Sequence, residues 1–254
     1  MRVDLNCDLG ESFGAYTLGH DELVMPHVTS ANIACGFHAG DPSVMRDTVG
    51  LAVKHGVAIG AHPGFSDLVG FGRRELQATP QEVEDLVAYQ IGALAGVAAA
   101  AGARLRHVKP HGALYNMAAR DQGLADAIAH ATLAVDRHLV LVGLSGSSLL
   151  EAGRNVGLAV ASEVFADRAY DANGALVSRS CRGAVLTEPA EVVERALHMV
   201  REGAVAAATG ERVDLRADTI CVHGDTSGAA DLAGRLRSAL EAAGVRVVAL
   251  GTDD

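Results

Sequence analysis

Short runs of β-branched and other apolar residues alternate along the chain with longer runs in which apolar positions recur every three or four residues. The short runs have the length of strands, and the longer ones have the period of helices with one buried face. Strands that alternate with helices are typical of a parallel sheet joined by crossover helices. The expected strands are Arg2–Cys7, Ser30–Cys35, Val57–Ala61, Leu105–Lys109, Leu139–Gly143, Ala159–Glu163, Thr219–His223 and Val245–Leu250. Seven or eight such units predict a single TIM-like (β/α) barrel over residues 1–254.

The clearest helix signal lies between Thr79 and Ala101. Thr79 and Glu82 have the spacing of a capping box, and Pro80 occupies the first helical position. Repeats and low-complexity linkers are absent from the sequence, so we expect one domain. Further helices are expected to begin near Pro42, Asp121, Ser147, Glu188 and Ser227.

Polar side chains gather where the expected strands end. In the first strand, the period of two would turn Asp4, Asn6 and Asp8 toward the barrel interior, and Leu5 and Cys7 toward the helices. Buried polar groups are costly unless they are hydrogen-bonded or engaged with a ligand. A capped turn is the simpler alternative, but a turn does not need a stacked inward row. We therefore expect polar groups from several strand ends to meet at one mouth of the barrel as an active site.

Two histidines follow strand ends that contain glycine, His38 in the segment 32–41 and His62 in the segment 60–64. With Asp8 they would form a facial site for a divalent metal, or an acid/base pair without a metal. A lone histidine is more often structural. A histidine just past a strand, beside glycines, recurs in several loops, and this recurrence favours a functional site.

Lys109 lies between His107 and His111 on one face of an expected strand. The chain has only one other lysine, Lys54, among its 21 basic residues. Burial and like charge should lower the pKa of Lys109 unless a carboxylate opposes them. The lysine could serve as an anion clamp or as a proton donor, and a surface lysine is the plainer alternative.

The segment from Glu163 to Arg179 adds an interior carboxylate, a second acid at Asp167 and two arginines, Arg168 and Arg179. Arginine binds carboxylate or phosphate through two parallel hydrogen bonds, so this loop favours an anionic substrate. A surface network of salt bridges is the alternative. The remaining candidate substrate-binding residues are Asn6, Glu11, Asn32, His223 and Asp225.

The composition narrows the class of partner. A net charge of -10 at pH 7 disfavours a nucleic acid or an anionic membrane, which leaves small molecules and proteins. Residues 1–7 lack the pattern of a signal peptide, and the apolar stretch Gly92–Gly102 is too short to span a bilayer. The four cysteines lack the CxxC spacing of metal sites. We expect a cytoplasmic protein.

Several strings along the chain resemble the LamB/YcsF family of 5-oxoprolinase A subunits. The matching strings are Asp4–Glu11, Asn32–Pro42, Gly60–Gly64, Val108–Asn116, Glu163–Arg179 and His223–Asp225. The resemblance runs in order over almost the whole chain. It implies a modified (β/α) barrel related to polysaccharide deacetylases. It also implies action with two further subunits, B and C, to open 5-oxoproline to L-glutamate at the expense of ATP.

The sequence lacks a Walker A phosphate loop, since neither lysine follows a glycine, and it lacks the Rossmann glycine pattern. We therefore expect ATP chemistry to be shared with or performed by the partner subunits. The serine-rich turn Ser145–Ser148, which precedes an expected helix, could still accept a phosphate.

Opening a lactam requires a water nucleophile, stabilisation of the oxyanion and protonation of the leaving nitrogen. We hypothesise that Asp8 or a histidine activates the water, and that Lys109 and Arg168 stabilise negative charge. Glu163 or His111 would protonate the nitrogen. Two other function classes stay open: a divalent-metal-dependent deacetylase or amidohydrolase, and a non-catalytic 5-oxoproline-binding subunit. The low aromatic content, 4% with no Trp, disfavours a sugar chain as the ligand.

Overall fold

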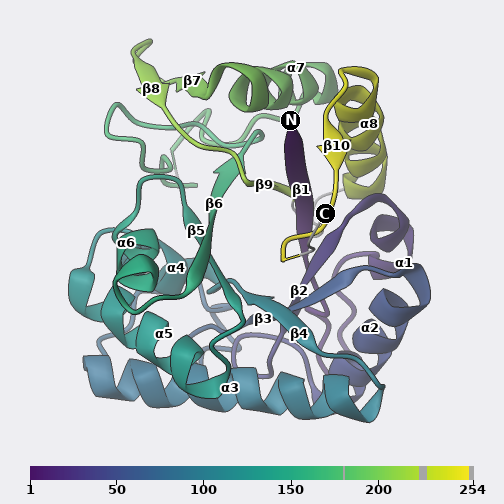
Figure 1. Cartoon of the computed structure of the whole chain (residues 1–254), viewed down its shortest axis with the longest axis vertical. Helices are drawn as coiled ribbons and strands as arrows, with labels where there is room; N and C mark the ends of the chain where they lie inside the picture. Colours follow the sequence, from purple (N-terminus) through teal and green to yellow (C-terminus); the bar gives the residue numbers. More distant parts are fainter. Residues whose placement is uncertain (180, 223–227, 252–254) are drawn as a thin grey trace.

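The computed structural model describes residues 1–179, 181–222 and 228–251. Its centre is a closed barrel of parallel strands in the order β1, β2, β3, β4, β5, β6, β9 and back to β1. Figure 1 shows the helices around the outside of this barrel. The barrel strands are β1 (Arg2–Leu9), β2 (Ser30–Ala34), β3 (Ala58–His62), β4 (Leu105–Val108), β5 (Val140–Leu144), β6 (Ala159–Phe165) and β9 (Thr219–Val222). The predicted α/β barrel is confirmed.

The last expected strand is much shorter than its apolar run. β10 (Arg246–Val247) pairs in parallel with Arg2 and Val3 of β1, just before β1 begins to pair with β9. It therefore lies outside the closed ring. A small antiparallel hairpin, β7 (Ala204–Ala206) with β8 (Arg212–Asp214), lies beside α7 at the top of Figure 1. Strands this short carry no periodic signal, so the sequence pattern did not predict this hairpin.

The helix starts agree with the expected capping signals. Thr79 and Glu82 form the capping box of α3, and Asp41 and Asp121 cap α2 and α5 with their side chains. Ser227, the expected start of the last helix, lies outside the described residues, and the helix itself begins after Gly228. The helices are α1 (Asp21–Val24), the 3-10 turn η1 (Met25–His27), α2 (Pro42–His55), α3 (Pro80–Ala100), α4 (Gly112–Ala118), α5 (Gln122–Val135), α6 (Ser148–Asn155), α7 (Pro189–Glu202) and α8 (Ala229–Ala242).

The alternation predicted for β1 is confirmed. Leu5 and Cys7 belong to the main apolar core, together with residues of the surrounding helices. Asp4 points inward and accepts hydrogen bonds from hydroxyl groups on the neighbouring strands β2 and β9. Burial raises the pKa of Asp4 to about 6 despite these hydrogen bonds. The barrel interior along β1 is therefore polar, and this polar row leads to Asp8 near the end of the strand.

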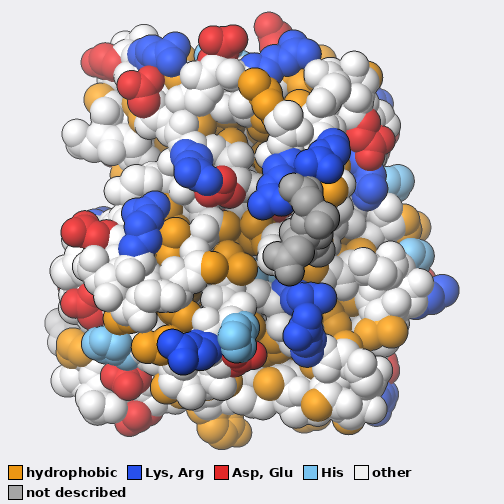
Figure 2. Space-filling model, in the orientation of Figure 1, with side chains coloured by type: hydrophobic (Ala, Val, Ile, Leu, Met, Phe, Trp, Pro, Cys, Tyr) orange, Lys and Arg blue, Asp and Glu red, His pale blue; other side chains and the backbone are white. Residues whose placement is uncertain are grey.

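In the described part of the chain, α3 is long and apolar enough to cross a membrane by length and composition alone. It packs against α5 and β3, and it buries Val83, Val87, Ile91 and Leu94 completely. This is the packing of an outer helix of a barrel. On the face drawn in Figure 2, basic side chains occur in separate groups among uncharged and acidic ones.

The barrel interior beside Gly60 of β3 leaves no space for a side chain at this position. A Cβ built on Gly60 would lie 2.0 Å from His107 Nε2, which is held by Asn32. We expect Gly60→Ala to destabilise the protein by about 1–3 kcal/mol, because His107 must move out of a packed interior. Gly50→Ala is the matched control: Gly50 lies in α2 with open space around it, so the change should stabilise by about 0.5–1 kcal/mol. Urea denaturation of both variants measures the difference, and equal stabilities would contradict the prediction.

Candidate functional site

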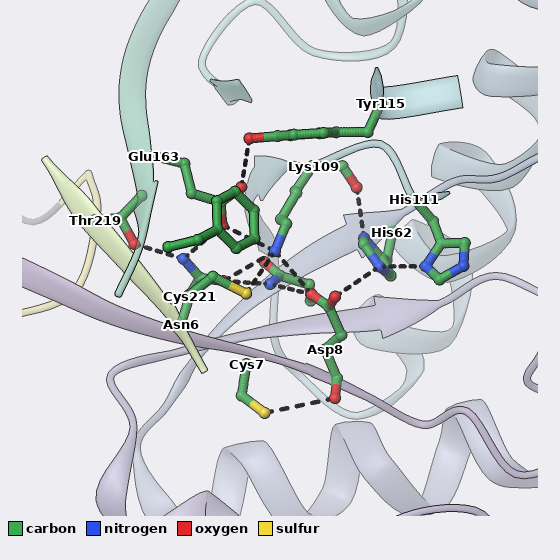
Figure 3. Close-up of polar contacts among 12 residues, drawn as sticks. Asn6, Cys7, Asp8, His62, Lys109, His111, Tyr115, Glu163, Thr219 and Cys221 are labelled. Atoms are coloured by element: carbon green, nitrogen blue, oxygen red, sulfur yellow. Dashed lines mark hydrogen bonds and ion pairs between the residues drawn. The ribbon is translucent and has the colours of Figure 1, made fainter. Parts of the chain in front are cut away.

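Lys109 immediately follows β4, and its side chain enters the barrel mouth, where it is 3% exposed. Its Nζ lies 2.9 Å from Asp8 Oδ1 and 2.8 Å from Glu163 Oε1 (Figure 3). It also donates to Asn6 Oδ1 at 3.2 Å, and the sulfur of Cys221 is 3.1 Å away. These partners belong to β1, β6 and β9, so the lysine connects strands that are far apart in the sequence.

The ammonium group of Lys109 is held in its charged form. Burial alone would lower its pKa, but attraction by Asp8 and Glu163 outweighs burial and raises the pKa well above its usual value. Burial lowers the pKa of His107 and of His111 to about 3, so both rings are neutral at pH 7 and add no like charge. The structure therefore favours a fixed positive charge at this position rather than a proton donor.

A buried layer of polar residues holds this charge in place. Glu163 is fully buried and accepts hydrogen bonds from the Tyr115 hydroxyl at 2.7 Å and from the Asn6 amide at 3.0 Å. Asn32 donates to Asn6 Oδ1 at 2.7 Å and to Asp8 Oδ1 at 2.8 Å. Glu163, Asn6 and Asn32 are not among the described residues that border the nearby cavity. Their contacts position the lysine and Asp8.

A cavity of about 570 Å³ opens at the carboxyl ends of the barrel strands. Asp8 is the partly exposed member of the charge network, with 16% of its side chain accessible. Polar groups from separate strand ends therefore do meet at one mouth of the barrel. The other acidic, basic and histidine residues that line the cavity are Glu11, His62, Arg73, Glu75, Lys109, His111, Arg120, Arg168 and Arg179.

His62 and His111 face each other, with His62 Nε2 2.9 Å from His111 Nδ1 (Figure 3). The second nitrogen of each ring lies against a main-chain carbonyl: His62 Nδ1 is 2.7 Å from the oxygen of Lys109, and His111 Nε2 is 2.8 Å from that of Phe71. A carbonyl oxygen only accepts hydrogen bonds, so these two nitrogens must carry the hydrogens. When both rings are neutral, the facing nitrogens are bare lone pairs, which repel unless a proton or a cation lies between them.

His38 and Glu11 complete this histidine cluster. The ring of His38 stacks on His111 with centroids 3.8 Å apart, and neither of its buried nitrogens has a hydrogen-bond partner among the described residues. Glu11 Oε1 is 3.7 Å from His111 Nδ1. One ligand atom from each of Glu11, His38, His62 and His111 lies within 4.8 Å of the others. Carbonyl groups commonly orient the second nitrogen of ligating histidines, so these residues fit a divalent ion.

The composition of this cluster differs from the predicted metal set of Asp8, His38 and His62. The structure groups Glu11 and His111 with the two histidines. Asp8 lies beside the cluster, with Oδ2 3.4 Å from His62 Nε2, while its Oδ1 belongs to the lysine network. We therefore place Asp8 next to the histidine cluster and not within it.

Phe71 is not among the residues that the sequence analysis singled out, yet it shapes the histidine cluster. Its backbone has φ +54°, in the left-handed region that bulky residues rarely adopt, and its carbonyl receives the hydrogen bond from His111. A Cβ on the next residue, Gly72, would lie 2.8 Å from His38 and 2.9 Å from His111. The close packing of this turn against the histidines explains why a glycine follows Phe71. The glycines at 70 and 72 are the signal that could have indicated a tight turn here.

The LamB/YcsF family profile matches residues 3–253 of the chain. A relative from Tolumonas auensis, named as the A subunit of 5-oxoprolinase, is 61% identical over 249 residues, which cover 98% of this chain and 99% of the relative. The chain belongs to the LamB/YcsF family. The crystal structure of a lactam utilization protein from Thermus thermophilus is 52% identical, with a TM-score of 0.93 over 98% of this chain and 100% of that one. A deacetylase structure with 16% identity and a TM-score of 0.50, covering 97% of this chain and 87% of that one, shares the fold alone.

In this LamB/YcsF barrel the predicted site residues fall into groups by position. Asp167 is buried after β6 and is not among the described residues that line the cavity. His223 and Asp225 lie outside the described residues. The predicted residues that line the cavity are Asp8, Glu11, His62, Lys109, His111, Arg168 and Arg179. Those buried around it are Asn6, Asn32, His38 and Glu163.

Proposed function

We propose that this LamB/YcsF protein is the A subunit of a 5-oxoprolinase, which opens the amide ring of 5-oxo-L-proline to give L-glutamate. Relatives named as 5-oxoprolinase A subunits support the proposal, with up to 61% identity over almost the full length. The observation that carries it is Lys109, a buried lysine held between two carboxylates beside a cavity that also contains the histidine cluster. A fixed positive charge, a carboxylate base and metal-type ligands can supply the activation of water and the stabilisation of charge that hydrolysis of an unstrained amide requires.

We assign the activation of water to Asp8. Its Oδ1 accepts hydrogen bonds from Lys109 and Asn32, so Oδ2 is the oxygen that would take a proton from the water as the water oxygen bonds to the carbonyl carbon. The same Oδ2 can return this proton to the ring nitrogen as the carbon–nitrogen bond breaks. The sequence hypothesis also named Glu163 as a proton donor, but Glu163 does not reach the described lining of the cavity.

Lys109 is the fixed cation of this reaction scheme. Its charge stays in place throughout, because the partly exposed Asp8 and the fully buried Glu163 hold the ammonium group in the charged form. A cation that is already oriented stabilises the negative charge that develops on the amide oxygen without further reorganisation.

We further propose that Glu11, His38, His62 and His111 hold a divalent metal ion. Bound there, the ion would polarise the amide carbonyl or lower the pKa of a bound water. The donor chemistry supports this: the tautomers of His62 and His111 are set by main-chain carbonyls, and one carboxylate accompanies three histidines.

We propose that ATP is bound and hydrolysed together with partner subunits B and C. The sequence lacks a phosphate loop, and the relatives are named as one subunit of 5-oxoprolinase, which supports an enzyme of several subunits.

Free cysteines and a reaction that consumes ATP support a cytoplasmic location. The net charge of -10 supports small-molecule and protein partners rather than a nucleic acid or an anionic membrane.

The buried carboxylate and histidines favour a second candidate function, a divalent-metal-dependent deacetylase or amidohydrolase that needs neither ATP nor partners. A third class, a non-catalytic 5-oxoproline-binding subunit, would bind the lactam without using Asp8 in the reaction. The deacetylase class predicts activity of the chain alone, and the binding-subunit class predicts a complex whose activity does not depend on Asp8.

We expect the purified chain to release no glutamate from 5-oxoproline and to hydrolyse no ATP, and the complex reconstituted with subunits B and C to do both. The reason is that the chain has hydrolytic groups but no phosphate loop. Glutamate and ADP are measured on the same preparations, with Asp8→Asn as the comparison complex. Metal-dependent amide hydrolysis by the chain alone would instead support the deacetylase class. Normal glutamate release by the Asp8→Asn complex would support the binding-subunit class.

A further inference from the structure

One lysine and one arginine are buried in the described part of the molecule, Lys109 at 3% exposure and Arg168 at 6%. Their surroundings differ in one respect. Lys109 contacts two carboxylates, whereas Arg168 forms no ion pair with any described residue. The guanidinium of Arg168 instead donates from Nη2 to the oxygen of Val177 at 2.7 Å and from Nε to that of Ala184 at 3.3 Å. These carbonyls orient the guanidinium but do not neutralise its charge.

The charge of Arg168 is poorly compensated by its neighbours. Burial lowers the pKa of Arg168, and repulsion by Arg179 lowers this pKa further. Attraction by the adjacent Asp167 raises the pKa, but by less than Arg179 lowers it. A buried charge without a counter-ion is costly, and removal from water is repaid only by a close opposite charge. Two neighbouring arginines in a protein with a net charge of -10 therefore form a local positive site.

The same arginines border the cavity that holds the hydrolytic groups. Two other cations in its lining form ion pairs: Arg120 with Glu75 at 2.6 Å, and Lys109 with Asp8. Arg168 and Arg179 add positive charge to the lining after the end of β6, in the loop that follows it. An anionic group on a ligand in the cavity would complete this part of the site.

We propose that Arg168, assisted by Arg179, binds the carboxylate of the substrate and selects lactams that carry a carboxylate over neutral lactams. The planar guanidinium matches a carboxylate through two parallel hydrogen bonds, and its orientation is already set by two carbonyls. This inference rests on the proposed lactam hydrolysis and adds the substrate group that the cavity recognises.

The test uses the complex assembled with subunits B and C and follows glutamate release at varied 5-oxoproline. We expect Arg168→Met to raise KM by about 30-fold or more while kcat changes by less than about 3-fold, because the lost charge pair contributes to binding. Arg168→Lys should restore part of the affinity, and Arg179→Gln should raise KM less, because Arg179 is exposed. Inhibition by 2-pyrrolidinone, the same ring without the carboxylate, should be equal in the wild-type and Arg168→Met complexes.

Arg120→Met is the matched control, since Arg120 borders the same cavity but is paired with Glu75. Melting temperature is recorded for every variant to separate loss of binding from unfolding. An unchanged KM in a folded Arg168→Met complex would overturn the inference, as would a fall in kcat alone. A loss of inhibition by inorganic phosphate with an unchanged KM for 5-oxoproline would assign the site to a phosphoryl group instead. A wild-type complex that releases no glutamate would refute the proposed function, which is a separate outcome.

Discussion

Replacing Lys109 with methionine is expected to lower the turnover of the assembled complex by about 100-fold or more, since one oriented cation is lost from the reaction site. The same change should destabilise the chain by about 3–5 kcal/mol, because Asp8 and Glu163 would lose the cation between them and Glu163 is fully buried. Methionine keeps much of the length of the lysine stem, so packing is largely preserved. Turnover and urea denaturation are measured on the same preparations.

A second variant separates the two effects of this substitution. Lys109→Met combined with Glu163→Gln removes one carboxylate along with the cation, so stability should recover in part while turnover stays low. Glu163→Gln alone should retain turnover within about 10-fold, because Glu163 positions Lys109 and does not reach the described lining of the cavity. A stable double variant with near-normal turnover would show that the lysine serves only to balance buried charge.

Replacing His62 with asparagine is expected to weaken divalent-metal binding by about 100-fold or more. Loss of a residue that only hydrogen-bonds to a metal ligand typically lowers metal affinity by about 10- to 100-fold, and loss of a ligand should lower it at least as much. The physical reason is that the change removes a proposed ligand nitrogen whose position is fixed: Nδ1 of His62 is tied to the carbonyl of Lys109, and Nε2 lies 2.9 Å from His111 Nδ1 within the cluster. Zinc and manganese titrations of the purified chain, followed by calorimetry, measure the affinity.

The melting temperature provides an independent measure of metal binding. An ion that binds only the folded chain stabilises it by about 2.7 kcal/mol at a free concentration 100 times its dissociation constant. We therefore expect added metal to raise the melting temperature of the wild-type chain and to leave that of His62→Asn unchanged. His198→Asn, at an exposed position on α7, is the control and should respond like the wild type. Equal metal responses in all three proteins would contradict a metal site at the histidine cluster.

The positions of the strands and long helices could be predicted because their signals are local. The capping box at Thr79 and Glu82 and the alternation of Leu5, Asn6 and Cys7 depend only on neighbours in the chain and on fixed helix and strand periods. The presence of Lys109 at a strand end follows from the same reasoning. The short β7–β8 hairpin was not predicted, because a strand of three residues does not establish a period.

The sequence by itself thus determined the barrel and the residue types that reach its mouth, but not how these residues pair. Closure of the barrel decides that Lys109 meets both Asp8 and Glu163, and that His111 joins the histidine cluster with Glu11. A carbonyl from the distant turn at Phe71 sets which nitrogen of His111 carries the hydrogen. Only the tertiary structure could settle these pairings, because hydrogen bonds and ion pairs act over a few ångströms, and a local pattern does not specify distances between loops that the folded chain alone brings together.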